Sequence, residues 1–277
     1  MDFLAANTGL GERIEHLVNP IRMYHHVIEE IARSDRRPRR ILDVGCSLGY
    51  GPFILSRGTG RITVVGVDIE QRKIEEARRL FDASRLIFHC LDIMDSTAVR
   101  KLVEETGQFD VVVCFEVLEH IPPEHSSRMM RNLRSALRED GLLFISTPNK
   151  AIYDIGAFTK DHVNELHYDE LLRLLRDAGF SVEKARGLQR RSRISSSLLL
   201  ELGLVERSGD RKVTLGKTER LLRKAIVLLF DWRTSLGFLL SRLSMAGYLE
   251  WKYRTAMNSA PEESVAVLLV ASRKARR

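Results

Sequence analysis

Five short apolar runs alternate with amphipathic segments between residues 41 and 146, and this alternation limits the folds open to the chain. The runs are rich in Val, Ile, Leu and Phe along their length, as expected for strands covered on both faces. They are Ile41–Val44, Ile62–Val67, Leu86–Cys90, Val111–Phe115 and Leu142–Ser146. Segments with helical spacing separate them at Glu70–Leu80, Ser96–Thr106 and Glu124–Glu139. The pattern predicts an α/β doubly wound parallel sheet, with ligands bound beyond the carboxyl ends of its strands.

Further elements are expected on both sides of this region. A helix over Tyr168–Ala178 precedes a sixth strand at Phe180–Ala185, and the last strand is Ser264–Ser272. We therefore expect four parts: a helical N-terminal extension, a core, a helical insertion before the last strand, and that strand with a basic tail. Their ranges are 1–38, 39–187, 188–263 and 264–277.

Charge is unevenly distributed along the chain. The net charge is +7, but residues 184–277 alone carry 20 basic and 8 acidic side chains. A positive field of this kind favours phosphorylated substrates, acidic lipid surfaces or nucleic acid, although a solvated basic face without a partner is the plain alternative. One apolar helix face runs from Leu221 to Leu229, and packing on the protein is preferred to lying on a membrane surface. Asp231 and Arg233 interrupt the best apolar window, so no bilayer span is expected.

The cysteine content and the N-terminal residues favour the same compartment. The three cysteines are an odd number, near predicted strand ends, which argues against a disulfide framework and for a reducing compartment. The start Met1-Asp2-Phe3 lacks a basic segment followed by an apolar one, so no secretory signal is expected. The expected location is the cytoplasm, with peripheral association at an anionic membrane surface as an additional option.

Acidic residues stand where a ligand would lie. The stretch from Ile41 to Gly51 predicts a strand, a small-residue loop and a helix, which brings backbone N–H groups close to a ligand. Asp68 ends the second strand and suits ribose hydroxyls. Asp92, after the third strand, could accept from an exocyclic amine, and Asp43 could orient the loop or reach a cationic amino group. These carboxylates, with Glu116 after the fourth strand, favour a cationic adenosine ligand over a dinucleotide pyrophosphate.

Five motifs in order resemble one family. They are Leu42–Gly49, Val65–Ile69, His89–Ile93, Phe109–Ile121 and Leu137–Asn149. With these motifs the chain resembles class I S-adenosylmethionine (SAM)-dependent methyltransferases, especially the type-11 group that includes ubiquinone-pathway O-methyltransferases. The resemblance covers roughly residues 39–187 and the final strand. Ser47 is a departure, because the family more often has glycine there.

The resemblance implies a Rossmann-like seven-stranded sheet whose last strand is antiparallel, with SAM as the cofactor. It implies that Gly45, Ser47 and Gly49 approach the methionine part, Asp68 holds the ribose, and Asp92 with Ile93 brackets the adenine. The complete set of predicted cofactor residues is Asp43, Gly45, Cys46, Ser47, Gly49, Asp68, Ile69, Asp92, Ile93 and Glu116.

Methyl transfer to a hydroxyl benefits from a general base. The candidates are His120, His162 and His167, with Glu119 behind them, and a structural role is the alternative for each histidine. Proximity and alignment supply the rest of the catalysis.

Three functions are open at this point. The first is O-methylation of a small-molecule, glycan or lipid-linked acceptor, with a histidine base, no metal ligand and nucleic acid not expected as a partner. The second is a metal-assisted RNA 2′-O-methyltransferase, because Glu116, Glu119 and His120 at i, i+3 and i+4, together with His162, resemble the ligand set of small-RNA terminal methyltransferases. The third is a non-catalytic SAM-binding protein.

Overall fold

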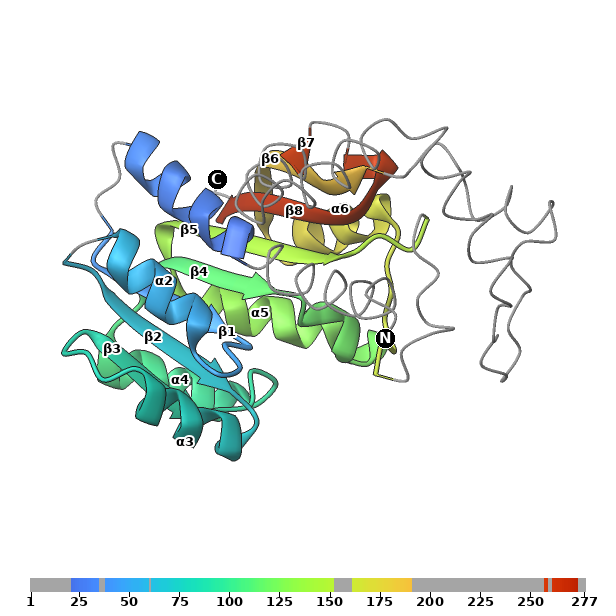
Figure 1. Ribbon diagram of the computed structural model, residues 1–277. Coiled ribbons are helices and arrows are strands. Elements are labelled where there is room, and N and C mark those ends of the chain that lie inside the picture. The colour runs from blue at the N-terminus through green and yellow to red at the C-terminus, as the bar shows by residue number, and fades with distance from the viewer. Residues whose placement is uncertain are drawn as a thin grey trace, which may run out of the picture.

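A single twisted sheet forms the centre of the protein (Figure 1). The computed structural model describes residues 21–34, 38–59, 61–151, 161–190, 257–258 and 261–273. The strands lie in the order β3-β2-β1-β4-β5-β8-β6-β7. Their bounds are β1 Arg40–Val44, β2 Thr63–Asp68, β3 Leu86–Cys90, β4 Phe109–Phe115, β5 Leu137–Pro148, β6 Phe180–Arg190, β7 Met257–Asn258 and β8 Ser264–Arg273.

The main sheet confirms the predicted architecture of seven strands. β1 to β5 pair in parallel, whereas β8 is antiparallel to both β5 and β6. The two residues of β7 add a short antiparallel pairing at the edge of β6. The last long strand therefore runs against the others, as the family resemblance implied.

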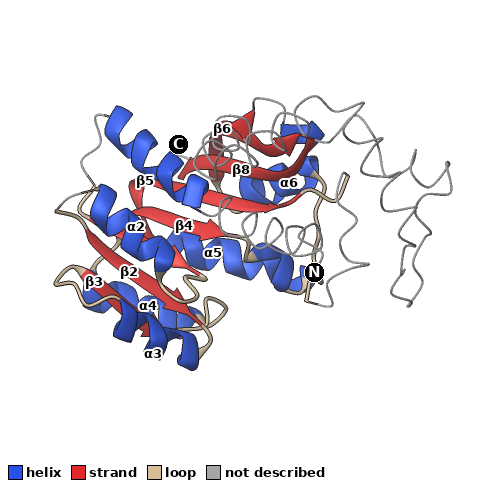
Figure 2. Ribbon diagram, viewed as in Figure 1, coloured by secondary structure: helices blue, strands red, loops and turns tan. Residues whose placement is uncertain are grey.

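Helices cover both faces of the sheet (Figure 2). On one face lie α4, α5 and α6, whose buried side chains pack on alternate strand residues such as Val112 and Cys114. On the other face lie residues 21–33, α2 and α3, which pack on Val111 and Val113. The helices are α2 Tyr50–Gly58, α3 Gln71–Leu80, α4 Ser96–Thr106, α5 Ser126–Ala136 and α6 Tyr168–Asp177. Short 3₁₀ turns are η1 Leu118–His120, η2 Pro123–His125 and η4 Pro261–Glu263.

Two boundaries differ from those expected. The segment expected to be one helix to Glu139 is η2, then α5, and β5 already begins at Leu137. Residues 138–140 are exposed and charged, so they carry no strand pattern, and a register shift between Phe109 and Val111 accommodates them. β6 runs on to Arg190. Thus the predicted insertion overlaps β6, β7 and η4 at its ends, while 191–256, with the predicted apolar face from Leu221, lies outside the described residues.

Polar contacts join the N-terminal helix to the sheet in addition to its apolar packing. The Tyr24 hydroxyl donates to Asp43 in β1, and Lys184 in β6 pairs with Glu30. Among the described helices, none has the length and apolar character needed to cross a bilayer.

Candidate active site

The loop between β1 and α2 is shaped by three residues with positive φ. These are Gly45 (φ +74°), Ser47 (φ +48°) and Gly49 (φ +83°). The amides of Gly45 and Cys46 both donate to the Val67 carbonyl, at 2.8 and 3.0 Å. A Cβ on Gly49 would lie 2.9 Å from the side chain of Ala77, so the loop needs glycine there for space as well as for conformation. The serine at 47 adopts the same left-handed region at some conformational cost.

Asp68 connects this loop to the end of β2. One carboxylate oxygen accepts from the Ser47 amide and the other from the Glu70 amide, each at 2.9 Å. An ionised carboxylate offers about four lone-pair sites, so two remain for ligand hydroxyls. Asp68 can therefore shape the loop and still hold a ribose, a combination that sequence spacing alone did not reveal.

Asp43 lies behind the loop and is fully buried. Its carboxylate oxygens lie 2.9 and 3.2 Å from the Tyr24 hydroxyl, which donates to them. Burial raises the pKa of Asp43 to about 8, and the charge of Asp68 adds to the rise. Tyr24 was not identified from the sequence, where it is one residue of an amphipathic helix. Cys46 is also buried, and burial raises the pKa of its thiol.

The predicted adenine-side residues differ in what they expose. Asp92 accepts from the Met94 amide at 2.8 Å and borders a cavity of about 400 Å³ that Ser96 and Arg128 also line. The side chain of Ile93 is buried in the core, and its carbonyl accepts from Asn132 Nδ2 at 2.7 Å. Ile69, after β2, is 64% exposed and available for apolar contact.

Two neighbouring carboxylates follow β4. Glu116 has a φ of +53°, and its Oε1 accepts from the Ser146 hydroxyl at 2.7 Å. Burial raises the pKa of Glu116. Glu119 accepts from the Thr147 hydroxyl at 3.1 Å, and burial, then the negative charge of Glu116, raises the pKa of Glu119 to about 9. A strained non-glycine residue beside buried acids is typical of a functional site.

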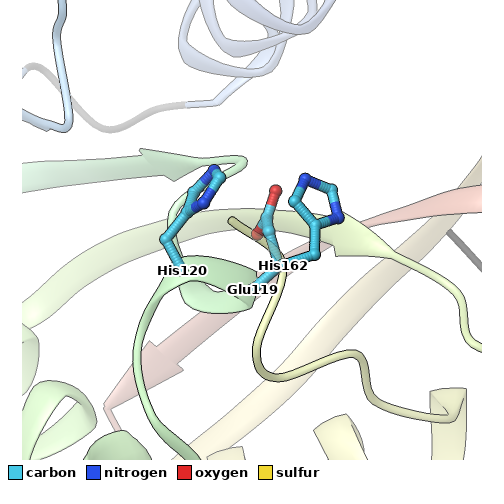
Figure 3. Close-up of side chains that lie close together, drawn as sticks. All are labelled: Glu119, His120 and His162. Atoms are coloured by element: carbon cyan, nitrogen blue, oxygen red, sulfur yellow. The ribbon is translucent and has the colours of Figure 1, made fainter. Parts of the chain in front are cut away.

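Two predicted histidines meet beside Glu119 (Figure 3). The ring centroids of His120 and His162 lie 5.0 Å apart, with the ring planes at 86°. Nδ1 of His120 lies 2.9 Å from the Asp161 carbonyl, and Nδ1 of His162 lies 3.3 Å from Glu165 Oε1. These contacts orient both imidazoles and leave Nε2 of each for a ligand or a proton.

The segment that carries His162 is docked on η1 by its backbone. The amides of Val163 and Asn164 donate to the Glu119 carbonyl at 2.9 and 3.1 Å. Asn164 is buried, and its side-chain amide donates to the Ser126 hydroxyl at 2.8 Å. Sequence reasoning missed Glu165 and Asn164 as site residues, although both belong to the histidine-containing segment that it singled out.

His167 has a different environment from the other two. It caps α6: its side chain accepts from the backbone of Glu170, whose carboxylate accepts from the His167 amide at 2.8 Å. It does not belong to the cluster of Glu119, His120 and His162.

That cluster also fits the donor set of a divalent metal. One ligand atom from each of the three side chains lies within 4.8 Å of the others. Two imidazoles and a carboxylate suit Zn²⁺ and other transition metals. Each Nδ1 contact is also the kind that commonly orients a metal-bound histidine. Glu116, the fourth member of the sequence-based set, is not part of this cluster and bonds to Ser146 instead.

The loop, Asp68 and Asp92 lie at the carboxyl edge of a doubly wound sheet. This arrangement is that of enzymes that bind a nucleoside-containing cofactor. Residues 15–185 match the family described as a methyltransferase domain, and the chain belongs to this family. It is a SAM-dependent methyltransferase with distant homology to ubiquinone biosynthesis O-methyltransferases. The positioning of Asp68, with lone pairs to spare beside the glycine-bent loop, fits SAM as the cofactor.

Relatives and solved structures bear on this assignment to different degrees. Ubiquinone biosynthesis O-methyltransferase from Xanthomonas axonopodis pv. citri is 28% identical over 200 residues, covering 65% of this chain and 79% of that protein. The plantazolicin methyltransferase BpumL superposes with a TM-score of 0.56 at 14% identity, over 97% of this chain and 89% of that one. The [4+2]-cyclase SpnF superposes with a TM-score of 0.53 at 18% identity, over 92% of this chain and 82% of that one. These two structural likenesses support the fold alone.

Proposed function

We propose that this enzyme methylates a hydroxyl of a small-molecule, glycan or lipid-linked acceptor, with His120 or His162 as the general base. The observation that carries the proposal is the pair of oriented imidazoles beside Glu119, on the edge where Asp68 and the loop would hold SAM. SAM supplies an activated methyl group for in-line transfer. The protein holds the donor, positions the acceptor and accepts the hydroxyl proton at an imidazole Nε2.

The contacts of each histidine support this role. The Asp161 carbonyl and Glu165 Oε1 hold the Nδ1 protons, which leaves the Nε2 lone pairs directed away from these partners. Glu119 is predominantly protonated near neutral pH because its pKa is about 9. The side chain of Glu119 is therefore uncharged beside the base, and its carboxyl group can donate a hydrogen bond.

The acceptor side has a natural location on the sheet. Pro148 in β5, Ala266 in β8 and Leu188 in β6 lie at one level of adjacent strands. The described chain therefore leaves β6 at Arg190 and returns at Met257 on the edge where β5 ends. We expect the segment 191–256, basic in composition, to contribute to acceptor recognition, including that of a phosphorylated or membrane-associated molecule.

Methyl transfer from radiolabelled SAM into extracted small-molecule, glycan and lipid fractions tests the acceptor class. Label in one of these fractions supports the proposal, whereas label confined to RNA contradicts it. With the acceptor found, His120→Ala and His162→Ala are compared with His125→Ala, a histidine of η2 outside the cluster. Loss of the base should lower kcat by about 10²–10⁴-fold. If neither cluster variant differs from the control, neither histidine is the base.

A second candidate follows from the three-residue cluster. A divalent cation bound by Glu119, His120 and His162 would hold and acidify the acceptor hydroxyl in place of a histidine base. This is the chemistry of the metal-assisted RNA 2′-O-methyltransferase considered above. Dialysis against EDTA, followed by Mg²⁺, Mn²⁺ or Zn²⁺, separates the two. A metal-dependent enzyme loses activity and regains it with the ion, whereas a histidine-base enzyme keeps its activity throughout.

A further inference from the structure

Glu165 and His162 form a largely buried carboxylate–imidazole pair in the active site. Oε1 of Glu165 lies 3.3 Å from Nδ1 of His162, three residues earlier in the chain. The side chain of Glu165 is 6% exposed and that of His162 is 14% exposed, so little water competes for the contact. A hydrogen bond in such a position is electrostatically stronger than the same bond in water.

The two histidines of the cluster differ in what their Nδ1 atoms contact. Nδ1 of His120 lies 2.9 Å from the Asp161 carbonyl, and His120 is exposed. Nδ1 of His162 faces the Glu165 carboxylate instead. A base becomes a cation when it takes a proton, and a carboxylate attracts that cation with a full negative charge, whereas a carbonyl offers only a dipole. The environment of His162 is therefore better suited to a base than that of His120.

His120 belongs to a set of contacts that dock the segment carrying His162 on the core. The Nδ1 contact of His120 reaches the residue directly before His162. The two backbone amides after His162 donate to the Glu119 carbonyl, and Leu166 bridges Asn149 at the end of β5. Thus His120 supports the backbone from which His162 projects, whereas the carboxylate contact orients the His162 ring.

A purely structural role is the alternative for Glu165, because an acid near the start of a helix is attracted to the helix dipole. The first turn of α6 already contains Asp169 and Glu170, and Glu170 also closes the helix cap with His167. Glu165 lies before that cap, and its carboxylate contacts the His162 ring. The contact with the ring is what a structural role alone does not explain.

We propose, on the basis of the O-methylation proposed above, that Glu165 is the positioning residue that makes His162, rather than His120, the general base. An ionised carboxylate can only accept a hydrogen bond. Glu165 therefore keeps the His162 proton on Nδ1 and leaves the Nε2 lone pair for the acceptor hydroxyl. A carboxylate that holds the tautomer of a catalytic histidine in this way also stabilises the imidazolium that forms.

The proton transfer that follows from this arrangement balances. The acceptor oxygen bonds the methyl carbon of SAM while the hydroxyl proton passes to Nε2 of His162. The electrons of the broken carbon–sulfur bond stay on sulfur, which becomes a neutral thioether. The imidazolium then gives its proton to water, and Glu165 stays ionised throughout.

Nitrogen NMR of the histidine-labelled, full-length protein with SAM tests the positioning without an acceptor. The two ring nitrogens give different chemical shifts when only one carries a proton, and slightly alkaline buffer keeps an ordinary histidine neutral. His162→Gln assigns the His162 signals by their disappearance. We expect Nδ1 of His162 to carry the proton in the wild-type protein, and a mixture of both tautomers in Glu165→Leu, which removes the acceptor. Unchanged His162 signals in Glu165→Leu would overturn the proposal.

Kinetics test which histidine is the base, with radiolabelled SAM and the extract fraction that accepts its label. His162→Gln should lower kcat by about 10²–10⁴-fold, because an amide takes up no proton. His120→Gln keeps a donor for the Asp161 carbonyl and should lower kcat by less than about tenfold. Glu165→Leu should lower kcat at least about tenfold and leave the dissociation constant for SAM within about twofold, as measured by calorimetry. Equal losses of kcat in the two glutamine variants would contradict the assignment of the base.

The matched control is Glu170→Gln, which changes a nearby carboxylate whose capping role glutamine also fills. It should leave the His162 signals in place and change kcat by less than about twofold. If Glu165→Leu does not fold, Glu165→Gln replaces it, and its amide, which can donate to Nδ1, should increase the Nε2-protonated form.

Failure of this proposal is distinguishable from failure of the proposed function. Wild-type protein that forms an O-methyl product, with the His162 tautomer and kcat insensitive to Glu165→Leu, overturns the role of Glu165 alone. Wild-type protein that forms no O-methyl product overturns the proposed function, and the NMR spectra then still report whether Glu165 orients His162.

Discussion

Tyr24 and Asp43 meet beneath the cofactor loop although they are 19 residues apart in sequence. The tyrosine ring also packs edge-to-face on Phe115, with centroids 5.2 Å apart, and fills the space beside Gly51. Among the described residues, Tyr24 donates to this buried carboxyl group, which depends strongly on it because no water replaces it. The N-terminal helix therefore supports the loop from behind.

Tyr24→Phe removes this donor and keeps the ring. We expect a loss of about 1–3 kcal/mol in the free energy of unfolding, the cost of an unsatisfied buried polar group. Because Asp43 lies directly behind the loop, the dissociation constant for SAM should also rise. Urea unfolding and calorimetry measure the two effects. Tyr50→Phe, at an exposed position on α2, should leave the free energy of unfolding unchanged, and an equal loss there would refute a specific structural role for Tyr24.

The raised pKa of Asp43 makes stability depend on pH. Its folded-state pKa is about 8, above the ordinary aspartate value of 3.8, so the folded protein binds the proton more tightly than the unfolded chain. The stabilisation that this proton gives the folded protein is complete below pH 3.8 and is lost as pH rises toward 8. Over that range the free energy of unfolding falls by at most about 1.4 kcal/mol per pH unit. Between pH 5 and 8, Asp43→Asn should make the measured slope less negative. An unchanged slope would contradict the assignment.

At the level of elements, one buried amide joins the end of β5 to the start of β8. Asn149 Nδ2 lies 3.2 Å from the carbonyls of Glu262 and Ser264, and 3.4 Å from that of Pro261. Because β5 and β8 are antiparallel neighbours, this contact fixes where β8 begins along the end of β5. It lies next to Thr147, the hydroxyl partner of Glu119.

Asn149→Ala should therefore cost about 2–3 kcal/mol in unfolding free energy, since buried carbonyls lose their donor. Denaturant unfolding measures the loss. Asn149→Asp keeps the acceptor for the Ala151 amide but opposes the carbonyl oxygens with another oxygen, so it should be at least as damaging. A well-tolerated aspartate would mean that the amide donor is not what holds this junction.

For the whole molecule, SAM binding should raise stability by mass action. At a ligand concentration of 100 times the dissociation constant the gain is about 2.7 kcal/mol. Asp68→Ala removes the predicted ribose acceptor and an anchor of the loop, so the SAM-dependent rise in melting temperature should largely disappear. Asp82→Ala, at an exposed position after α3, is the matched control and should retain the rise. A full rise in Asp68→Ala would exclude Asp68 from cofactor binding.

The sequence by itself determined the doubly wound sheet, and it predicted the edge of that sheet at which the cofactor is expected. Alternating apolar runs report which segments are buried on both faces, and acids at the ends of Ile62–Val67 and Leu86–Cys90 report the functional edge, because these signals are local in the chain. The charged start of β5 and the extension of β6 were not predicted, since pairing with neighbouring strands, rather than side-chain pattern, makes those residues extended.

Only the tertiary structure decided which of the candidate residues lie side by side. His120 and His162 are far apart in sequence and meet because backbone amides after His162 dock on the Glu119 carbonyl. His167, equally plausible in the sequence, instead caps α6. The contact of Tyr24 with Asp43 likewise depends on how helices pack on the sheet. Local periodicity specifies which face of an element is buried, whereas the partner across that face is specified only by the packing of the folded chain.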